Sequence, residues 1–250
     1  MDKCITITTD FGDDFAAAQI RAVMATLNHN GRVIENHSVT SFSITEGAFE
    51  IYVVAKYAPK GTVHLGCIDP GVGSERRAII IKNSSSWFVG PDNGLLFPAA
   101  TSAAVEKIWE IDEQSVSKQI SHTFHCRDVF IKTAVYLAQG KKPGEFGSKI
   151  IPITQIKELF LNPGQVLHID NYGNIKIYWP GDLPIGQRVR IKKNGLELNL
   201  PIVKTFSNVN PGESLSYRGS NDTLEIAINL GNAAFEYQIN CGDTLEINSV

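Results

Sequence analysis

The 250-residue sequence predicts an α/β amino-terminal domain followed by a smaller all-β domain. Through about residue 70, β-branched runs alternate with helical patterns, which is typical of a sheet with parallel strands. From residue 165 onward, short apolar runs alternate with turn signatures such as Asn194-Gly195, and no helical pattern interrupts them. We therefore expect residues 1–162 to form a domain with a mainly parallel sheet, and residues 163–250 to form a small antiparallel barrel.

Apolar periodicity and turn residues locate the elements of both domains. In the first domain we expect strands at 5–9, 32–35, 63–68, 78–82 and 87–89, and helices at 13–28, 45–57 and 129–139. In the second we expect strands at 165–170, 174–179, 187–193, 196–200, 223–228 and 243–247. Asp128 is the predicted cap of the last helix, which Gly140 ends.

The composition excludes several classes of protein. Hydrophobic residues make up 43% of the chain and charged residues 20%, as in soluble globular proteins. A net charge of -3 with mixed signs predicts neither nucleic-acid nor membrane binding. No run reaches the roughly 20 apolar residues of a membrane span, and the first apolar run is too short for a signal peptide, so we expect a cytoplasmic protein.

The four cysteines are scattered without a CxxC pair, which argues against a zinc ribbon and a disulfide framework. Cys4 and Cys67 lie in apolar strand runs, where we expect them to be small core residues. Cys126 is a candidate nucleophile beside His125, but adjacent side chains generally diverge, so its base would have to come from elsewhere.

Two acids follow predicted strands of the first domain. Asp69 ends the strand at 63–68, a turn with proline and two glycines follows, and Arg76 lies seven residues on. A carboxylate at a rigid strand end with a guanidinium nearby can hold a small polar reactant, although the same residues also fit a surface turn. Asp10 follows the strand at 5–9, where it can accept hydrogen bonds from a ribose diol or lead a helix.

Metal sites are the alternative interpretation of these polar side chains. The acids of residues 10–14 loosely resemble the aspartate cluster of calcium-dependent nucleoside hydrolases, although the upstream acid of that cluster is absent. His122 and His125 are three residues apart, a spacing that can place both on one helix face and form a zinc site with Asp69 or Asp128.

Six motifs occur in the order and at roughly the spacing of one known family. They are Thr9–Gly12, Asp69–Gly73 with Arg76, Pro91–Leu96, Thr123–Asp128, Ile169–Asn174 and Asn229–Ala234. Through them the chain resembles, over nearly its full length, the S-adenosylmethionine hydroxide adenosyltransferases. These enzymes are also called S-adenosylmethionine hydrolases and are related to fluorinases and chlorinases.

The resemblance implies an α/β domain joined to a carboxy-terminal β-barrel, in a homotrimer whose substrate binds between the first domain of one subunit and the barrel of the next. It implies attack of water or hydroxide on the ribose C5′ atom of S-adenosyl-L-methionine, releasing adenosine and L-methionine. No cofactor and no metal are expected, because the sulfonium is already a good leaving group.

The resemblance also implies roles for individual residues. Asp69, Arg76 and His125 would hold and activate the water, and either Asp69 or His125 would accept its proton. Asp10 would hold the ribose hydroxyls. The remaining implied substrate contacts are Phe42 and Phe124 as apolar walls, Asp170 for the methionine ammonium, Tyr172 stacked on adenine, Asn174 and Asn229 at the adenine edge, and Ser220 for the carboxylate.

Two features of the sequence bear on the choice of nucleophile. The halogenating relatives lack the Asp-Pro-Gly-Val-Gly turn, and the charge of Asp69 would repel a halide, so water is favoured. Cys126 stands where the family usually has glycine. Two other functions fit the same residues: a sensor that binds S-adenosylmethionine or adenosine without turnover, and a metal-dependent nucleoside hydrolase.

Overall fold

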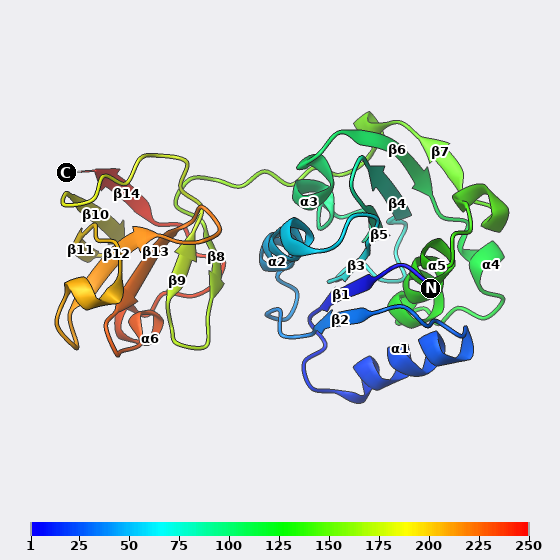
Figure 1. Ribbon diagram of the computed structural model, residues 1–250, viewed down its shortest axis with the longest axis horizontal. Helices are drawn as coiled ribbons and strands as arrows, with labels where there is room; N and C mark the ends of the chain where they lie inside the picture. Colours follow the sequence, from blue (N-terminus) through cyan, green and yellow to red (C-terminus); the bar gives the residue numbers. More distant parts are fainter. Residues whose placement is uncertain (1, 250) are drawn as a thin grey trace. The chain divides into compact units, whose positions relative to one another are not determined.

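The computed structural model describes residues 2–249, and the chain divides into two compact units, residues 1–159 and 160–250 (Figure 1). The first unit contains two hydrophobic clusters, one on each face of its central sheet. The second unit has a hydrophobic cluster of its own, formed by residues between Val166 and Ile247.

A seven-stranded mixed sheet forms the centre of the first unit. Its strands are β1 (Ile5–Thr9), β2 (Val33–Asn36), β3 (Val63–Cys67), β4 (Ala78–Asn83), β5 (Trp87–Pro91), β6 (Val105–Glu110) and β7 (Lys149–Ile151). They lie in the order β2-β1-β3-β5-β4-β6-β7. The pairs among β2, β1, β3 and β5 are parallel, as predicted, whereas β4, β6 and β7 add antiparallel pairs. The sequence did not predict β6 and β7, so the sheet is more mixed than expected.

Helices cover both faces of this sheet (Figure 1). They are α1 (Phe15–Thr26), α2 (Ile44–Tyr57), α3 (Phe97–Thr101), α4 (Glu113–Val116), α5 (Ile131–Ala138) and the π-helical turn η1 (Cys126–Phe130), with short 3-10 turns η2 (Pro143–Phe146) and η3 (Ile153–Gln155). Helices α1 and α5 share one hydrophobic cluster, and α2 and α3 share the other. Between residues 2 and 249, every helix is too short or too polar to cross a membrane.

The prediction that Asp128 caps the helix of residues 129–139 is wrong. Asp128 lies inside η1, which continues directly into α5. Its carboxylate accepts hydrogen bonds from the Ser121 backbone at 2.8 Å and from Arg127 at 2.7 and 2.8 Å. The side chain therefore fixes the loop that precedes η1, which is the loop that carries Phe124.

His64 on β3 gives the first unit a pH-sensitive core. Its side chain is fully buried, stacks on Phe88 with the ring centroids 5.0 Å apart, and has Nδ1 2.7 Å from the Thr6 hydroxyl. Burial lowers the pKa of His64 from 6.5 to about 4. Between these two values the unfolded chain binds more protons than the folded chain, so folding stability falls as the pH decreases.

We expect the wild-type protein to lose about 2 kcal/mol more unfolding free energy between pH 7 and pH 5 than His64→Gln, because only the wild-type core must exclude this proton. Urea unfolding at both pH values measures the difference. Equal losses of unfolding free energy in the two proteins would show that burial does not lower the pKa of His64.

The second unit consists of two antiparallel sheets. Its elements are β8 (Val166–Ile169), β9 (Ile175–Ile177), β10 (Arg188–Lys193), β11 (Leu196–Pro201), β12 (Ser214–Arg218), β13 (Leu224–Ile228), β14 (Glu246–Ser249), α6 (Ala233–Tyr237) and the 3-10 turn η4 (Phe206–Asn208). One sheet has the order β11-β10-β14 and the other β12-β13-β9-β8. The six predicted strands are present, but β12 and α6 were missed. The two separate sheets do not confirm the prediction of a small barrel.

Candidate active site

Asp10 and Asp69 lie at the same edge of the first unit's sheet. They follow β1 and β3, which are parallel neighbours paired through Thr9 and Cys67 at their carboxyl ends. Ligands commonly bind at this edge of an α/β sheet. A cavity of about 330 Å³ opens there, lined by Asp10, Phe11, Asp14, Ala16, Ser41, Phe42, Cys67, Asp69, Val72, Thr123, Phe124 and Cys126.

Asp69 and Arg76 form a bidentate ion pair beside the cavity. The Arg76 Nε lies 3.1 and 3.0 Å from the two Asp69 carboxylate oxygens, and Nη2 lies 2.7 Å from Oδ2. Both side chains are largely buried, with exposed fractions of 5% for Asp69 and 7% for Arg76. The planar guanidinium thus fixes the orientation of a carboxylate that lines the cavity.

His125 contacts the same arginine. Its Nδ1 lies 3.0 Å from Arg76 Nη2, so Nδ1 accepts this hydrogen bond and the proton of the neutral ring is on Nε2. Of the three predicted catalytic residues, Asp69 lines the cavity. Arg76 contacts Asp69, and His125 contacts Arg76, so both lie next to the cavity.

Glu113, at the start of α4, is a member of this cluster that the sequence did not predict. Its Oε1 lies 3.5 Å from Arg76 Nη1 and 3.4 Å from His125 Nδ1. Arg76 therefore has carboxylates on two sides. The ring of Phe130 covers a face of the guanidinium, whose Cζ atom lies 5.2 Å from the ring centroid. The segment before α4 has little periodicity, and no local signal connects it with Arg76.

Asp10 holds Phe42 at the mouth of the cavity. The Asp10 Oδ2 atom accepts a hydrogen bond from the Phe42 backbone N–H at 2.8 Å. Phe42 has a φ of +66°, in the left-handed region that residues other than glycine rarely adopt, and the residue is 71% exposed. A strained backbone that presents an exposed aromatic ring beside a cavity is typical of a ligand-binding position.

Phe124 forms another wall of the cavity and is held between two neighbours. Its ring meets Phe11 edge to face at 5.6 Å, and the Arg127 guanidinium lies 5.0 Å from its centroid. The π-helical turn η1 begins two residues later. Such turns often occur at functional sites, because the extra residue redirects neighbouring side chains.

Asn93 explains why the Pro91–Gly94 turn belongs to this site. Its amide donates a 2.9 Å hydrogen bond to the Ile68 carbonyl, and its oxygen accepts one from the Leu95 backbone at 3.1 Å. Ile68 directly precedes Asp69, so the Asn93 side chain fixes the backbone from which the Asp69 carboxylate projects.

Gly73 packs the Asp69 turn against the loop that carries His125. It has a φ of +77°, and an added Cβ would lie 2.5 Å from the His122 carbonyl oxygen. We expect Gly73→Ala to lower the free energy of unfolding by about 2 kcal/mol, because the new methyl group needs both a left-handed backbone and space that is occupied.

Chemical denaturation measures this loss. Gly144→Ala is the matched control, since no atom lies within 4 Å of its added Cβ and its φ is not positive. Equal stability of the two variants would contradict the close packing of the turn.

The structure gives little geometric support to the metal sites considered as an alternative. His122 is exposed, and the Nδ1 atom of His125 is occupied by the guanidinium of Arg76, whose charge opposes a cation. Among the described residues, the acids of residues 10–14 do not bring three ligand atoms within 4.8 Å of one another.

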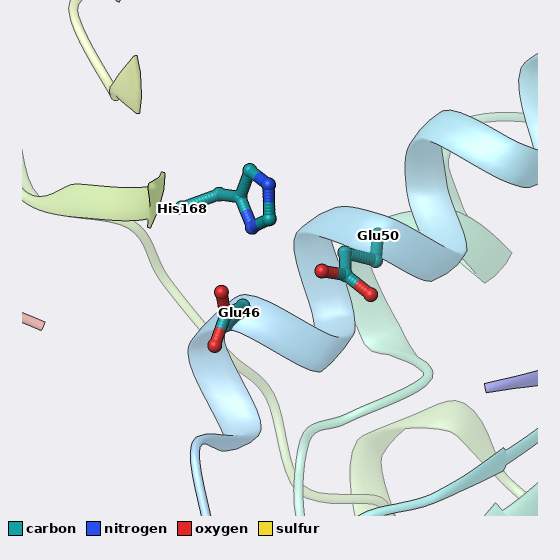
Figure 2. Close-up of side chains that lie close together, drawn as sticks. All are labelled: Glu46, Glu50 and His168. Carbon is teal, nitrogen blue, oxygen red and sulfur yellow. The ribbon is translucent and has the colours of Figure 1, made fainter. Parts of the chain in front are cut away.

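Two further buried acids of the first unit stabilise the segment that leads to Phe42. Figure 2 shows Glu46 and Glu50 on successive turns of α2. Glu46 accepts a 2.9 Å hydrogen bond from the Thr40 backbone, and Glu50 accepts one from the Asn36 side chain. The third side chain drawn there, His168, belongs to β8 of the second unit.

The second unit contains a cavity of its own, of about 840 Å³. It is lined by Asp170, Tyr172, Asn174, Lys176, Phe206, Tyr217, Ser220, Glu225, Ile228, Asn229, Leu230 and Gly231. All five substrate-binding residues predicted in this part of the chain are therefore at one cavity. The first unit's cavity likewise contains Asp10, Phe42 and Phe124.

Asp170 fixes the turn between β8 and β9. Its Oδ1 accepts hydrogen bonds from the backbones of Tyr172 and Asn174, both at 3.0 Å, and its Oδ2 accepts from the Asn174 amide at 3.0 Å and Lys176 Nζ at 3.2 Å. Burial alone would raise the pKa of Asp170, but the Asn174 hydrogen bonds and the Lys176 charge outweigh it and lower the pKa. The side chain is thus a carboxylate at neutral pH.

Lys176 links Asp170 to a second, more deeply buried acid. Its Nζ lies 3.0 Å from Glu225 Oε2, which also accepts a 2.7 Å hydrogen bond from the Tyr217 hydroxyl. Burial and the hydrogen bond to Glu225 raise the pKa of Tyr217, which keeps the phenol protonated. Two carboxylates with one ammonium give the cavity a formal charge of -1, which favours a cationic group.

The remaining predicted residues lie around the rim and walls of this cavity. Tyr172 is 79% exposed, and Ser220 is exposed in the turn before β13. Asn174 and Asn229 each donate one amide hydrogen bond within the unit, to Asp170 and to the Val209 carbonyl. Their amide oxygens therefore keep fixed positions from which they can accept hydrogen bonds.

Known families and structures match both units. Residues 5–147 match the SAM hydroxide adenosyltransferase N-terminal domain, and residues 164–246 match the corresponding C-terminal domain. The (R)-S-adenosyl-L-methionine hydrolase of Salinispora tropica is 33% identical, over 98% of this chain and 97% of that protein. A fluorinase of an Actinoplanes species is 23% identical over 97% of this chain and 96% of its own length.

A crystal structure of an uncharacterized conserved protein from Thermotoga maritima has the same fold as this chain. It superposes with a TM-score of 0.89 at 30% identity, covering 98% of this chain and all of the other.

Proposed function

Because this chain belongs to the SAM hydroxide adenosyltransferase family, we propose that it is an enzyme that hydrolyses S-adenosyl-L-methionine to adenosine and L-methionine. The observation that carries the proposal is the carboxylate of Asp69, oriented by Arg76 at a cavity with aromatic walls. This arrangement holds a water molecule without requiring a metal ion.

In the proposed reaction the water oxygen forms a bond to the ribose C5′ atom as the bond from C5′ to sulfur breaks. The electron pair of that bond goes to sulfur, which becomes the neutral thioether of methionine. The water loses a proton to Asp69 or His125, and the adjacent guanidinium of Arg76 stabilises the developing hydroxide. Because Asp69 lines the cavity and His125 Nδ1 already accepts a hydrogen bond from Arg76, the geometry favours Asp69 as the acceptor.

We assign the substrate contacts to residues of the two cavities. In the first unit, Asp10 binds the ribose hydroxyls, and Phe42 and Phe124 pack against the sugar and the adenine. The charge of Asp69 disfavours a halide nucleophile, so water is the reactant.

In the second unit, Asp170 attracts the methionine ammonium, and its cavity carries the formal charge that suits this group. Tyr172 stacks on adenine, Asn174 and Asn229 bind its edge, and Ser220 binds the carboxylate. We propose that a homotrimer brings the second unit of one subunit to the first unit of the next.

Incubation with S-adenosyl-L-methionine in water enriched in oxygen-18 tests the reaction. Chromatography with mass detection should find methionine and adenosine that carries the heavy oxygen at C5′, with the rate unchanged by a chelator. Adenine and free ribose derivatives would instead identify a nucleoside hydrolase, and tight binding without products would identify a sensor.

Mixing two inactive variants tests the shared site. We expect co-expressed Asp69→Asn and Asp170→Asn chains to recover about a quarter of the wild-type rate. In randomly mixed trimers, about one interface in four joins the intact first unit of an Asp170→Asn chain to the intact second unit of an Asp69→Asn chain. The separately purified variants are the controls, and light scattering gives the assembly size. No recovery in a confirmed mixed oligomer would mean that each site is formed by one chain.

A further inference from the structure

Two cysteines meet at the floor of the first unit's cavity. Cys67 is the last residue of β3 and Cys126 is the first residue of η1, and both line the cavity although they are only 4% and 2% exposed. The two side chains pack in the same hydrophobic cluster and interact directly with each other. The sequence predicted Cys67 to be a core residue, and it is one, but it also forms part of the cavity wall.

The pair connects the two segments that carry the proposed catalytic groups. Cys67 lies two residues before Asp69, and Cys126 directly follows His125. The other two cysteines are far from the pair or belong to the other unit. Cys4 lies five residues before Thr9, which is the strand partner of Cys67. Five residues of extended chain span about 16 Å, so Cys4 is far from Cys67. Cys241 belongs to the second unit and contacts the Leu167 carbonyl at 3.4 Å.

We propose that Cys67 and Cys126 form an oxidative modification site, at which a peroxide joins them in a disulfide that suppresses the activity of the adjacent catalytic cluster. One thiol is first oxidised to a sulfenic acid while hydrogen peroxide is reduced to one water molecule. The second sulfur then displaces the sulfenic oxygen, which leaves as a second water molecule, and the sulfur–sulfur bond forms. A dithiol reductant reverses the reaction by exchange.

The environment of the pair sets how readily this happens. The hydrogen bond with Cys126 and burial raise the pKa of the Cys67 thiol, and the nearby carboxylates of Asp69 and Asp10 add to the effect. The thiolate is the reactive form, so the pair resists brief exposure to oxidant and reacts during sustained exposure. Peroxide is small enough to enter the cavity that both thiols line.

A disulfide changes the distance between β3 and η1. It brings the sulfur atoms to about 2.05 Å, closer than two sulfur atoms that are not bonded to each other can approach, so the segments that carry Asp69 and His125 must shift. A displacement of about 1 Å at reacting groups lowers turnover by about 100-fold. This consequence for activity depends on the proposed hydrolysis, whereas formation of the disulfide does not.

The test treats the intact protein with excess hydrogen peroxide, blocks remaining thiols with an alkylating reagent, and maps the peptides by mass spectrometry. We expect a linked pair of peptides containing Cys67 and Cys126, and a protein mass reduced by two hydrogen atoms. Hydrolysis should fall at least 10-fold and return after dithiothreitol. The variant with Cys4→Ser and Cys241→Ser should respond in the same way.

Cys67→Ala and Cys126→Ala separate the pair from other oxidation. Each should yield no linked peptide, and each should keep its own untreated rate to within about twofold after peroxide treatment. Absence of the linked peptide in the wild type overturns the modification site, whether or not the protein hydrolyses S-adenosylmethionine. A linked peptide with an unchanged rate, or equal loss of rate in Cys126→Ala, overturns the effect on activity.

Discussion

Asp69→Asn is expected to lower kcat for S-adenosyl-L-methionine hydrolysis by about 100-fold or more, with a much smaller change in KM. The amide keeps the size of the carboxylate but cannot accept the proton that water loses. It also removes the charge that Arg76 neutralises, so the water is no longer held by a fixed anion. Steady-state kinetics with adenosine detection measures the effect.

The first unit offers a matched control for this variant. Asp92 is buried like Asp69 and pairs with Arg77 at 2.7 Å, but it does not line the cavity. We expect Asp92→Asn to lower the unfolding free energy by about 2 kcal/mol while the folded protein keeps its turnover. Full activity of Asp69→Asn would contradict the assignment of Asp69, and equal loss in both variants would indicate damage to the fold instead.

Arg76→Lys is expected to lower kcat by about 100-fold despite keeping the positive charge. The guanidinium contacts Asp69, His125 and Glu113 at once, through three different nitrogens. An ammonium is a single point of contact, so it cannot orient the carboxylate and the imidazole together. The water then loses its fixed position even though the charge near Asp69 is unchanged.

Arg77→Lys is the corresponding control, since Arg77 is the next residue and binds Asp92 away from the cavity. It should lose some stability and keep the wild-type kcat. Arg76→Lys should also keep the wild-type affinity for adenosine, because Arg76 does not line the cavity. Calorimetry measures this affinity. An Arg76→Lys variant with wild-type kcat would rule out the proposed role of the guanidinium.

Local patterns predicted much of the first half of each unit. The strands and helices up to residue 91 alternate with clear periodicity, and the structure confirms them with shifts of one or two residues at their ends. By contrast, β6 and β7 lie at the antiparallel edge of the sheet, where Ile108 is the one buried residue of β6 and β7 has none. Their place in the sheet depends on pairing with β4, which no short stretch of sequence encodes.

The same limit applies to the candidate site. Asp10 and Asp69 were predictable because both follow parallel strands, and topology alone brings such residues to one edge. The positions of Glu113 beside Arg76 and of Cys67 beside Cys126 were not predictable. Each depends on segments about 40 to 60 residues apart that meet only when the helices pack on the sheet. The arrangement of the second unit is a further example: the sequence predicted a small barrel and the structure has two separate sheets, because local patterns specify strands and turns but not how sheets join.

The separate hydrophobic clusters of the two units have a consequence for evolution and for design. No cluster residue is shared between the unit that presents Asp69 and the unit that presents Asp170. Substitutions that alter the nucleophile pocket therefore need no compensating changes in the packing around the second cavity. Under the proposed mechanism, such modularity lets a lineage exchange the reactant that attacks C5′ while the second unit retains its substrate contacts.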